Sequence, residues 1–404
     1  MKHNLKKHYS FKTASIVGLC LLVSGCDNNS WWSKKSQAEL NAEQIKLVIP
    51  MSSKNRQSWA DDIFDIMNQF KIPKNKENVC SIVAVVDQES NFIANPVVPG
   101  LGAKAVKEIN IRLSQKFEDK FGETIGKQMA GYFEDVLKNQ PSPDNSYMSQ
   151  MRKVKTERDL DQLYREIFDF MASHYHISAL TGAAKLVGQD FSEKFNPITT
   201  LGSMQVLITY AQNNKREHMN NNELRDDLYT QYGGLYYGIH RLMMYEADYD
   251  KPIYRFADYN SGMYSSRNAA IQTELNALID PKEHLDLDGD LLIYNKDGSA
   301  LSSLSDTEKT LIDLFNRNNI VITPDQIRAD LEKEKQKSFE KTKTYYSINK
   351  LYEEKTGKEA VYAVMPEVII SGPKLSRDYN TNWYASRVNG RYQTCLKRAK
   401  KIKL

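Results

Sequence analysis

Glu89 is an ionisable residue in an apolar stretch, a combination that suits general acid catalysis. The apolar residues Ile82, Val85 and Val86 precede it by seven, four and three positions. Because these offsets match the helical repeat, a helix over residues 78–90 places all four side chains on one face. Apolar surroundings favour the protonated carboxyl, which can donate its proton to the leaving oxygen of a glycosidic bond. Taken alone, the pattern fits a solvated glutamate at a helix end better.

Two distant fragments change that balance. They are Gly202-Ser203-Met204-Gln205 and Asp258-Tyr259-Asn260-Ser261-Gly262, the latter preceded by Ala257. With Glu89-Ser90-Asn91-Phe92, they resemble in order the three signatures of lysozyme-like lytic transglycosylases, which are Glu-Ser-x-Phe, Gly-Leu-Met-Gln and Ala-Tyr-Asn-Ala-Gly. Members of that family cut the glycan strands of peptidoglycan. The fragments are weak singly, but their ordered set favours this family.

The resemblance implies a role for each matching residue. Glu89 is the general acid and then the base, without a second carboxylate as nucleophile. The substrate's N-acetyl group assists, the muramic 6-hydroxyl attacks, and the cleaved MurNAc–GlcNAc bond leaves a 1,6-anhydro sugar. No cofactor or metal takes part. The implied substrate-binding residues are Ser90, Ser203, Met204, Gln205, Tyr259 and Asn260.

The chain departs from the family pattern in two ways. Glu89 and Gly202 are 113 residues apart (202 − 89), where the family has a short loop, so we expect a helical insertion over about residues 97–198. Ser203 and Asp258 replace apolar residues, and a second carboxylate at Asp258 leaves hydrolysis open. The expected fold is mainly α, with an α+β lysozyme-like core, the long helical insertion and a short extended C-terminal segment. An inactive lysozyme-like peptidoglycan-binding or scaffold lipoprotein is the alternative function.

The N-terminus predicts a lipoprotein. Residues 1–25 combine a basic head with an apolar run too short to span a bilayer permanently, and Leu-Val-Ser-Gly-Cys resembles a lipobox that ends at Cys26. Residues 26–44 are mostly polar and are interpreted as a lipid-anchored linker that reaches roughly 25 Å. Trp31-Trp32 lies either at the lipid interface or on the domain. The protein would face the periplasm, with the outer membrane favoured and Asp27 leaving the inner membrane open.

The charge balance argues against nucleic acid as a partner. The full chain has 55 basic and 51 acidic residues, and the four lysines of residues 1–25 account for the difference. A neutral mature chain lacks the field that attracts phosphate backbones. The basic C-terminal tail, interpreted as a solvated terminus, comprises Lys397, Arg398, Lys400, Lys401 and Lys403. The expected partners are peptidoglycan and, through the anchor, the membrane; the sequence indicates no protein partner.

Two cysteines remain once Cys20 leaves with the signal and Cys26 is acylated. Cys80 and Cys395 would meet in an oxidising compartment, where disulfides persist. A disulfide between them is favoured over two buried thiols. It would fasten the end of the chain to the helix that carries Glu89.

The remaining elements belong to a domain over residues 45–404. Helices are expected at about 56–69, 103–138, 157–189, 306–316 and 325–356. Ser305 with Glu308 forms a capping box, and Gly357 is a helix stop. Residues 360–370 look extended, and Pro366 restricts them to an edge or broken strand.

Two groups of polar residues suggest metal ligands at first sight. Asp286-Leu287-Asp288-Gly289-Asp290 resembles a calcium loop, but its glycine comes too early and position twelve is an aspartate. An acidic turn that caps backbone groups, or a contact with stem peptides, is therefore favoured. His174 and His176 belong to no metal motif and are expected at the surface.

Overall fold

The structure is a computed structural model that describes residues 38–174, 189–295, 298–370 and 378–403. Over these residues the protein is mainly helical, as the sequence predicts. None of the helices described is long and apolar enough to cross a membrane. The predicted signal peptide, Cys26, Asp27, Trp31-Trp32 and His176 lie outside the described residues.

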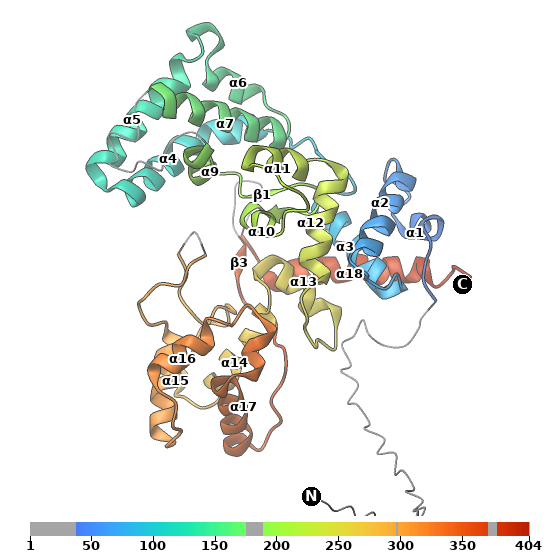
Figure 1. Cartoon of the computed structure of the whole chain (residues 1–404), viewed down its shortest axis with the longest axis vertical. Helices are drawn as coiled ribbons and strands as arrows, with labels where there is room; N and C mark the ends of the chain where they lie inside the picture. The colour runs from blue at the N-terminus through green and yellow to red at the C-terminus, as the bar shows by residue number, and fades with distance from the viewer. Residues whose placement is uncertain (1–37, 175–188, 296–297, 371–377, 404) are drawn as a thin grey trace, which may run out of the picture.

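The described helices form three large groups, each around its own buried side chains (Figure 1). The central group comprises α1 (Ala42–Val48), α2 (Arg56–Gln69), α3 (Lys76–Glu89), α10 (Ile208–Asn213), α11 (Asn221–Leu228), α12 (Gln231–Met243), α13 (Pro252–Ser261) and α18 (Thr381–Ala399). The upper group comprises α4 (Leu101–Phe121), α5 (Glu123–Asn139), α6 (Tyr147–Lys153), α7 (Glu157–His174) and α9 (Gln189–Phe195). The lower group comprises α14 (Ser265–Asn276), α15 (Asp306–Arg317), α16 (Pro324–Leu331) and α17 (Lys343–Thr356).

Short strands and 3-10 turns connect these groups. The antiparallel strands β1 (Thr200–Leu201) and β2 (Val206–Leu207) enclose the loop that carries Gln205. Strand β3 (Ile369–Ile370) pairs with β4 (Tyr379–Asn380), so only the end of the predicted extended segment 360–370 forms a strand. The 3-10 turns are η1 (Pro143–Asn145), η2 (Pro281–Glu283) and η3 (Lys337–Lys341).

Helix α3 lies inside the central group because it is apolar on nearly every side. Residues Asn78–Val86 are all buried, and α18 packs along α3 in the antiparallel direction. The two helices are joined by a disulfide between Cys80 and Cys395, whose Cα atoms are 5.4 Å apart. Arg391 and Asp87 form an ion pair with a nitrogen–oxygen distance of 3.1 Å farther along. The disulfide favoured from the sequence is thus present.

The packed domain begins earlier than the predicted linker boundary at residue 44. The side chain of Leu40 is buried, and its backbone N–H donates to the carbonyl of Lys74 at 2.9 Å. Glu39 pairs with the ammonium group of Lys74 at 2.8 Å. Helix α1 follows, capped by Asn41. The polar composition that suggested a linker here reflects a helix cap and a surface ion pair.

The single helix predicted over about 103–138 is wrong, since two helices occupy this range. The chain reverses at Gly122, whose φ of 79° and ψ of 166° suit glycine. Helix α5 then packs closely on α4, and a Cβ at Gly126 would lie 2.4 Å from the Cα of Glu118. The apolar side chains of this range therefore belong to two helices that pack on each other. Of the helix predicted over 157–189, the described residues are those of α7, which begins at Glu157 as expected, and Gln189, the first residue of α9.

The single helix predicted over 325–356 is also wrong. The fully buried Arg267 donates to the carbonyl of Gln336 at 3.0 Å and to the carbonyl of Glu334. These carbonyls accept hydrogen bonds from the Arg267 side chain. This contact interrupts the helix between α16 and α17. The flanking signals are confirmed: Ser305 and Glu308 form the capping box of α15, and Gly357 ends α17 with a φ of 68°.

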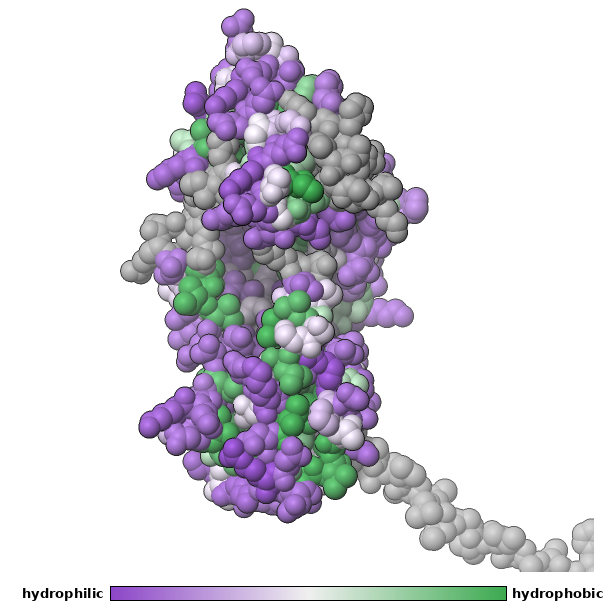
Figure 2. Space-filling view, turned by 90° about the vertical axis from the view of Figure 1, so that its left-hand side faces the viewer, coloured by the Kyte–Doolittle hydropathy of each residue, from purple (hydrophilic) through white to green (hydrophobic). Residues whose placement is uncertain are grey.

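The acidic turn over residues 286–290 satisfies polar groups of the lower part of the molecule. Asp288 accepts from the backbone N–H of Asp290 at 3.0 Å and from the Gln272 amide at 2.8 Å. Asp290 pairs with Lys335 at 3.3 Å. The lower group leaves apolar side chains at the surface, among them Ile293, Leu304 and Val321, and Figure 2 shows hydrophobic residues gathered over this part of the face turned to the viewer.

Glu274 should make stability depend on pH. Its side chain is 1% exposed, and burial, with a smaller contribution from Glu353, raises its pKa to about 8 from 4.5. A folded-state pKa above the unfolded value gives stability that is full below pH 4.5 and is lost as pH rises through about 8. We therefore expect Glu274→Gln to flatten the decline of the melting temperature between pH 5 and 8. The same change at the exposed Glu283 should leave that decline intact; equal slopes in both variants would contradict the assignment.

Candidate functional site

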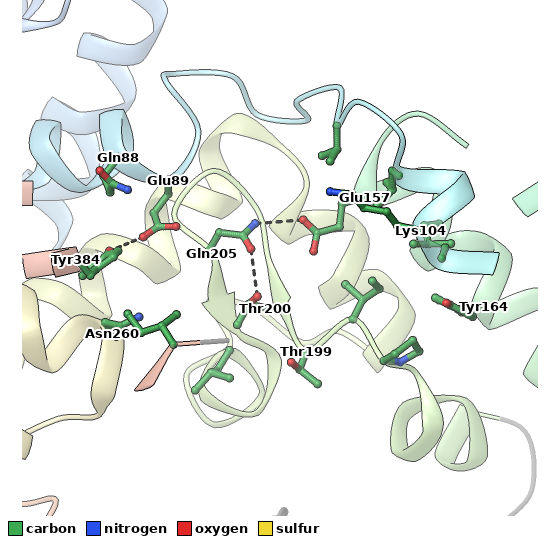
Figure 3. Close-up of a pocket in the computed structure, with 18 of the residues that line it drawn as sticks. Gln88, Glu89, Lys104, Glu157, Tyr164, Thr199, Thr200, Gln205, Asn260 and Tyr384 are labelled. Carbon is green, nitrogen blue, oxygen red and sulfur yellow. Dashed lines mark hydrogen bonds between the residues drawn. The ribbon is translucent and has the colours of Figure 1, made fainter. Parts of the chain in front are cut away.

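A cavity of about 560 Å³ lies where the central and upper groups of helices meet. Glu89, Gln205, Tyr259 and Asn260 all contribute to its wall. They come from α3, the β1–β2 loop and α13, so the fold brings together segments that are far apart in the sequence. Figure 3 shows the side chains of Glu89 and Gln205 directed toward the same space.

Glu89 is the last residue of α3 and is partly exposed. The hydroxyl of Tyr384, from the first turns of α18, donates a hydrogen bond to its Oε1 (Figure 3). Burial, together with the nearby Glu89 carboxylate, raises the pKa of Tyr384 well above its usual range. Tyr384 therefore keeps its proton and acts as a hydrogen-bond donor. A donor of this kind stabilises the ionised form of a carboxyl group.

Gln205 is held by backbone geometry and by three side-chain bonds. Its φ is 50°, in the left-handed region that non-glycine residues seldom adopt. The amide oxygen accepts from the Thr200 hydroxyl at 3.1 Å, while Nε2 donates to the Gly202 carbonyl at 3.2 Å. Nε2 also donates to Glu157 Oε2 at 3.3 Å. The amide is thus fixed between two carboxylates, with Glu89 on one side and Glu157 on the other (Figure 3).

Tyr259 connects α13 to this loop at the cavity wall. Its hydroxyl donates to the Met204 carbonyl at 2.8 Å, and its own carbonyl accepts from Arg241 at 3.0 Å. The Arg241 guanidinium also lies 5.4 Å from the centre of the Tyr259 ring. Burial raises the pKa of Tyr259, so the phenol remains protonated and fixes the loop. Asn260 follows it and is partly exposed at the cavity wall.

Three predicted substrate-binding residues do not line the cavity. Ser90 is buried and donates its hydroxyl to the Val86 carbonyl at 3.1 Å. Ser203 and Met204 are fully buried against α12, where a Cβ on Gly238 would lie 2.3 Å from Met204 Sδ. The side chains of Ser203 and Met204 support the Gln205 loop from inside the protein. The predicted direct contact of these side chains with substrate is therefore wrong.

Asp258 is not a second carboxylate of the cavity. It is 1% exposed and accepts five hydrogen bonds that hold the turn from α13 into α14. The donors are the hydroxyls of Tyr245, Tyr249 and Ser265 and the backbone N–H groups of Tyr264 and Ser266. The role in hydrolysis left open for Asp258 is therefore excluded by its position. The second carboxylate at the cavity is Glu157.

The sequence reasoning missed the residues that the upper group and α18 contribute to the cavity. They include Lys104, Glu157, Leu160, Trp383 and Tyr384, and Arg241 of α12 was missed as well. Only one signal could have located any of them. Because Cys80 lies nine positions before Glu89, an antiparallel helix attached at Cys395 would bring residues near position 386 (395 − 9), within a helical turn of Tyr384, to Glu89.

The cavity combines few charges with apolar surface. Glu89 and Glu157 supply negative charge, Lys104 and Arg241 positive charge, and Val98, Leu101 and Leu160 an apolar side. Among the residues that the structure describes, no cluster of His, Cys, Asp and Glu could hold a metal ion. The chemistry that these side chains offer is proton transfer by a carboxyl group, with amide and hydroxyl groups to orient a polar ligand.

Comparison with known proteins places the chain in a family. Residues 52–398 match the model described as "Protein of unknown function (DUF1615)". The chain belongs to this family. This DUF1615 protein is also 31% identical over 381 residues to the uncharacterized protein YaiW of Escherichia coli (strain K12), covering 93% of the chain and 96% of that relative. No solved structure matches it. Neither description states an activity.

Gly202 tests how tightly the Gln205 loop is packed in this DUF1615 protein. Its φ is +79°, and a Cβ would lie 2.2 Å from the Leu228 carbonyl oxygen. Gly100 has a similar φ of +72° with nothing within 4 Å of a Cβ. Gly100→Ala should therefore lower the free energy of unfolding by about 1 kcal/mol through backbone strain alone. Gly202→Ala should lower it by clearly more in urea titrations, and equal effects would show that the loop yields freely.

Proposed function

We propose that this protein is a membrane-anchored peptidoglycan lytic transglycosylase that cleaves the MurNAc–GlcNAc bond. Glu89 serves as its single acid and base. The observation that carries the proposal is the convergence of Glu89, Gln205, Tyr259 and Asn260 on one cavity. These residues were selected from the sequence by the order of three short signatures. A shared active site requires that the three sequence signatures contribute side chains to the same cavity. Signatures that matched by chance would not be expected to do so.

The surroundings of Glu89 suit a group that changes its charge during the reaction. Glu89 first gives its proton to the glycosidic oxygen and later takes one from the muramic 6-hydroxyl. Between these steps it is a carboxylate, which the hydroxyl of Tyr384 stabilises. The partly exposed position of Glu89 allows contact with a ligand in the cavity. Atoms balance without water, because the 6-oxygen replaces the leaving oxygen at the anomeric carbon.

The remaining wall suits a sugar chain. Trp383 adds aromatic surface to the wall, with Tyr379 stacked on its ring at 3.9 Å between centres and the Arg387 guanidinium 5.2 Å from the ring centre. Gln205 and Asn260 carry amides that can donate to and accept from hydroxyl and N-acetyl groups. The volume of the cavity falls in the usual range for ligand sites. We also propose that α3, the β1–β2 loop, α12 and α13 correspond to the lysozyme-like core, with the upper helices as its insertion.

The location follows from the predicted anchor. Acylation of Cys26 would hold the protein at a periplasmic membrane face, with the outer membrane favoured and the inner membrane consistent with Asp27. The competing function, an inactive wall-binding or scaffold lipoprotein, would keep the same cavity without cleavage. The two functions differ in their products and can be separated by one digestion.

Digestion of purified sacculi distinguishes glycan cleavage from wall binding without cleavage. We expect the unacylated mature chain to release 1,6-anhydro-muropeptides, detected by chromatography and mass spectrometry. Glu89→Gln should lower their rate of formation on the order of 10²-fold or more, because the proton donor is lost. Glu157→Gln makes the same change at the other carboxylate of the cavity and should retain most of the activity.

Other products would redirect the proposal. Reducing ends in place of anhydro sugars would mean hydrolysis. A greater loss in Glu157→Gln than in Glu89→Gln would move the acid to the opposite wall. Sacculi that stay intact while they retain the protein in pull-down experiments would favour the wall-binding alternative.

Tyr384→Phe tests the hydrogen bond to Glu89. Without this donor the carboxylate is less stable, so Glu89 should keep its proton to a higher pH. We expect a lower maximal rate and an alkaline limb of the pH–rate profile displaced to higher pH. Tyr164→Phe, at the opposite wall of the cavity (Figure 3), should leave the position of the limb unchanged. A purely structural role of Tyr384 would lower the rate at every pH without displacing the profile.

A further inference from the structure

A second cavity, of about 360 Å³, lies along α18 between Arg387 and Arg398. Its α18 side comes from residues spaced four, three and four apart, which therefore share one helix face. They are Arg387, Arg391, Thr394 and Arg398, and Pro50, Val83, Ala84 and Asp87 complete the lining with Gly390. The proposed enzymatic function uses none of these side chains.

The charge of this cavity is positive. Three guanidinium groups face one carboxylate, Asp87, which pairs with Arg391 at 3.1 Å. Arg398 donates to the Val48 carbonyl at 3.1 Å, and its charge acts on Asp87 together with that of Arg391. The excess of positive charge is two. Guanidinium groups bind phosphate oxygens in a forked geometry, so the cavity suits a phosphate group.

The basic tail extends this positive charge along the surface. Lys397, Lys400, Lys401 and Lys403 are exposed. The tail nevertheless lies on the domain, because Gln44 of α1 donates to the Lys403 carbonyl at 3.4 Å and Ile402 packs on the central core. Figure 1 shows the C-terminus beside α1. The predicted solvated terminus is thus a fixed edge of the protein, with its lysine side chains in solvent.

Apolar side chains stand beside these cations. Leu47, in the last turn of α1, is 56% exposed, and Met51, next to Pro50 of the cavity wall, is 83% exposed. Exposed apolar groups surrounded by basic residues are typical of surfaces that contact anionic lipid. The nearby Glu43 is paired with Lys46 at 3.7 Å, so it adds little negative charge to the surface.

The predicted anchor attaches at the same edge. Cys26 precedes Glu39, where the packed domain begins, by 13 residues (39 − 26), a length that spans roughly 18–22 Å as a flexible coil. A tether of this length keeps α1 and the neighbouring tail close to the membrane that holds the acyl chains. Contact between this edge and the lipid therefore needs no rearrangement of the domain.

We propose that this basic surface docks on an anionic phospholipid membrane. The basic surface consists of Leu47, Met51, Arg387, Arg391, Arg398, Lys397, Lys400, Lys401 and Lys403. The arginine cavity receives a headgroup phosphate, and the two apolar side chains enter the interface. Lys400 follows Tyr384 by 16 residues, so the lysine edge of this surface lies roughly 24 Å along the helix direction from the cavity at Glu89, whereas Arg387 lies within one helical turn of Tyr384. The membrane then fixes the direction in which that cavity opens, whether or not it cleaves glycan.

Vesicle binding tests the proposal without the lipid anchor. The chain from residue 27 onward contains every buried group that the structure describes and lacks the acylated cysteine. It should sediment with vesicles of phosphatidylcholine mixed with phosphatidylglycerol, and at least tenfold less with phosphatidylcholine alone. Raising the salt concentration should weaken the binding, because the attraction is electrostatic.

Variants locate the binding surface. Replacing Lys397, Lys400, Lys401 and Lys403 by Gln should weaken binding at least tenfold, and Arg387→Glu and Met51→Asp should each weaken it. The matched control replaces by Gln four lysines of the upper and lower groups whose side chains are 57–62% exposed: Lys127, Lys138, Lys309 and Lys350. The control should bind as the unchanged chain does, and melting temperatures should confirm that all variants fold.

Three outcomes would overturn the proposal. Equal binding to neutral vesicles would remove the role of charge. An equal loss in the control variant would show that net charge matters and the surface does not. Binding of inorganic phosphate in calorimetry, lost in Arg387→Glu, without any binding to vesicles would identify a site for a soluble phosphate compound. None of these results depends on glycan cleavage, so the membrane proposal and the enzymatic proposal can fail separately.

Discussion

The antiparallel pairing of α3 with α18 is the constraint on which the rest of the structure depends. Helix α3 is too apolar to be stable with a face in water, and α18 covers it. The Cys80–Cys395 disulfide closes a sequence separation of 315 residues. In the chain-entropy model this is worth at most roughly 5–6 kcal/mol. The covalent link therefore holds the last helix of the domain against one of the first.

This pairing places a charged group at the end of an apolar contact. Glu89 comes at the last position of α3, where the helix leaves the core, and Tyr384 comes from the start of α18. The same two helices thus carry a disulfide at one end and a carboxylate–phenol hydrogen bond at the other. Helix α18 also carries the arginine cavity on its remaining length. A substitution that shifts this helix would disturb both surfaces together.

Local signals in the sequence located elements well but not their partners. The helix predicted over 56–69 matches α2, and the Ser305–Glu308 capping box is present, because both depend on neighbouring residues. The breaks at Gly122 and beside Arg267 escaped prediction. Gly122 by itself does not show that the chain reverses there, because single glycines also occur inside helices. Arg267, which interrupts the later helix, lies about 70 positions before it, and residue spacing carries no information over that distance.

The candidate site divides in the same way. Glu89, Gln205, Tyr259 and Asn260 were found from short motifs and meet at the cavity. Ser203, Met204 and Asp258 belong to the same motifs, but they turn inward to support the loop and the following helix. A motif constrains a segment of backbone, and the fold determines which side chains reach the ligand. Tyr384 and Glu157 could not be identified because only the tertiary structure makes them neighbours.

The upper helices decide how the two carboxylates of the cavity differ. Glu157 enters from α7, is 6% exposed, and accepts from the Gln205 amide. Glu89 is more exposed, and its donor is a phenol at the opposite wall. A general acid must reach the ligand, and a residue that orients an amide need not. The more accessible carboxyl is therefore the better proton donor, and Glu157 is better suited to hold Gln205 in the position from which it can bind substrate.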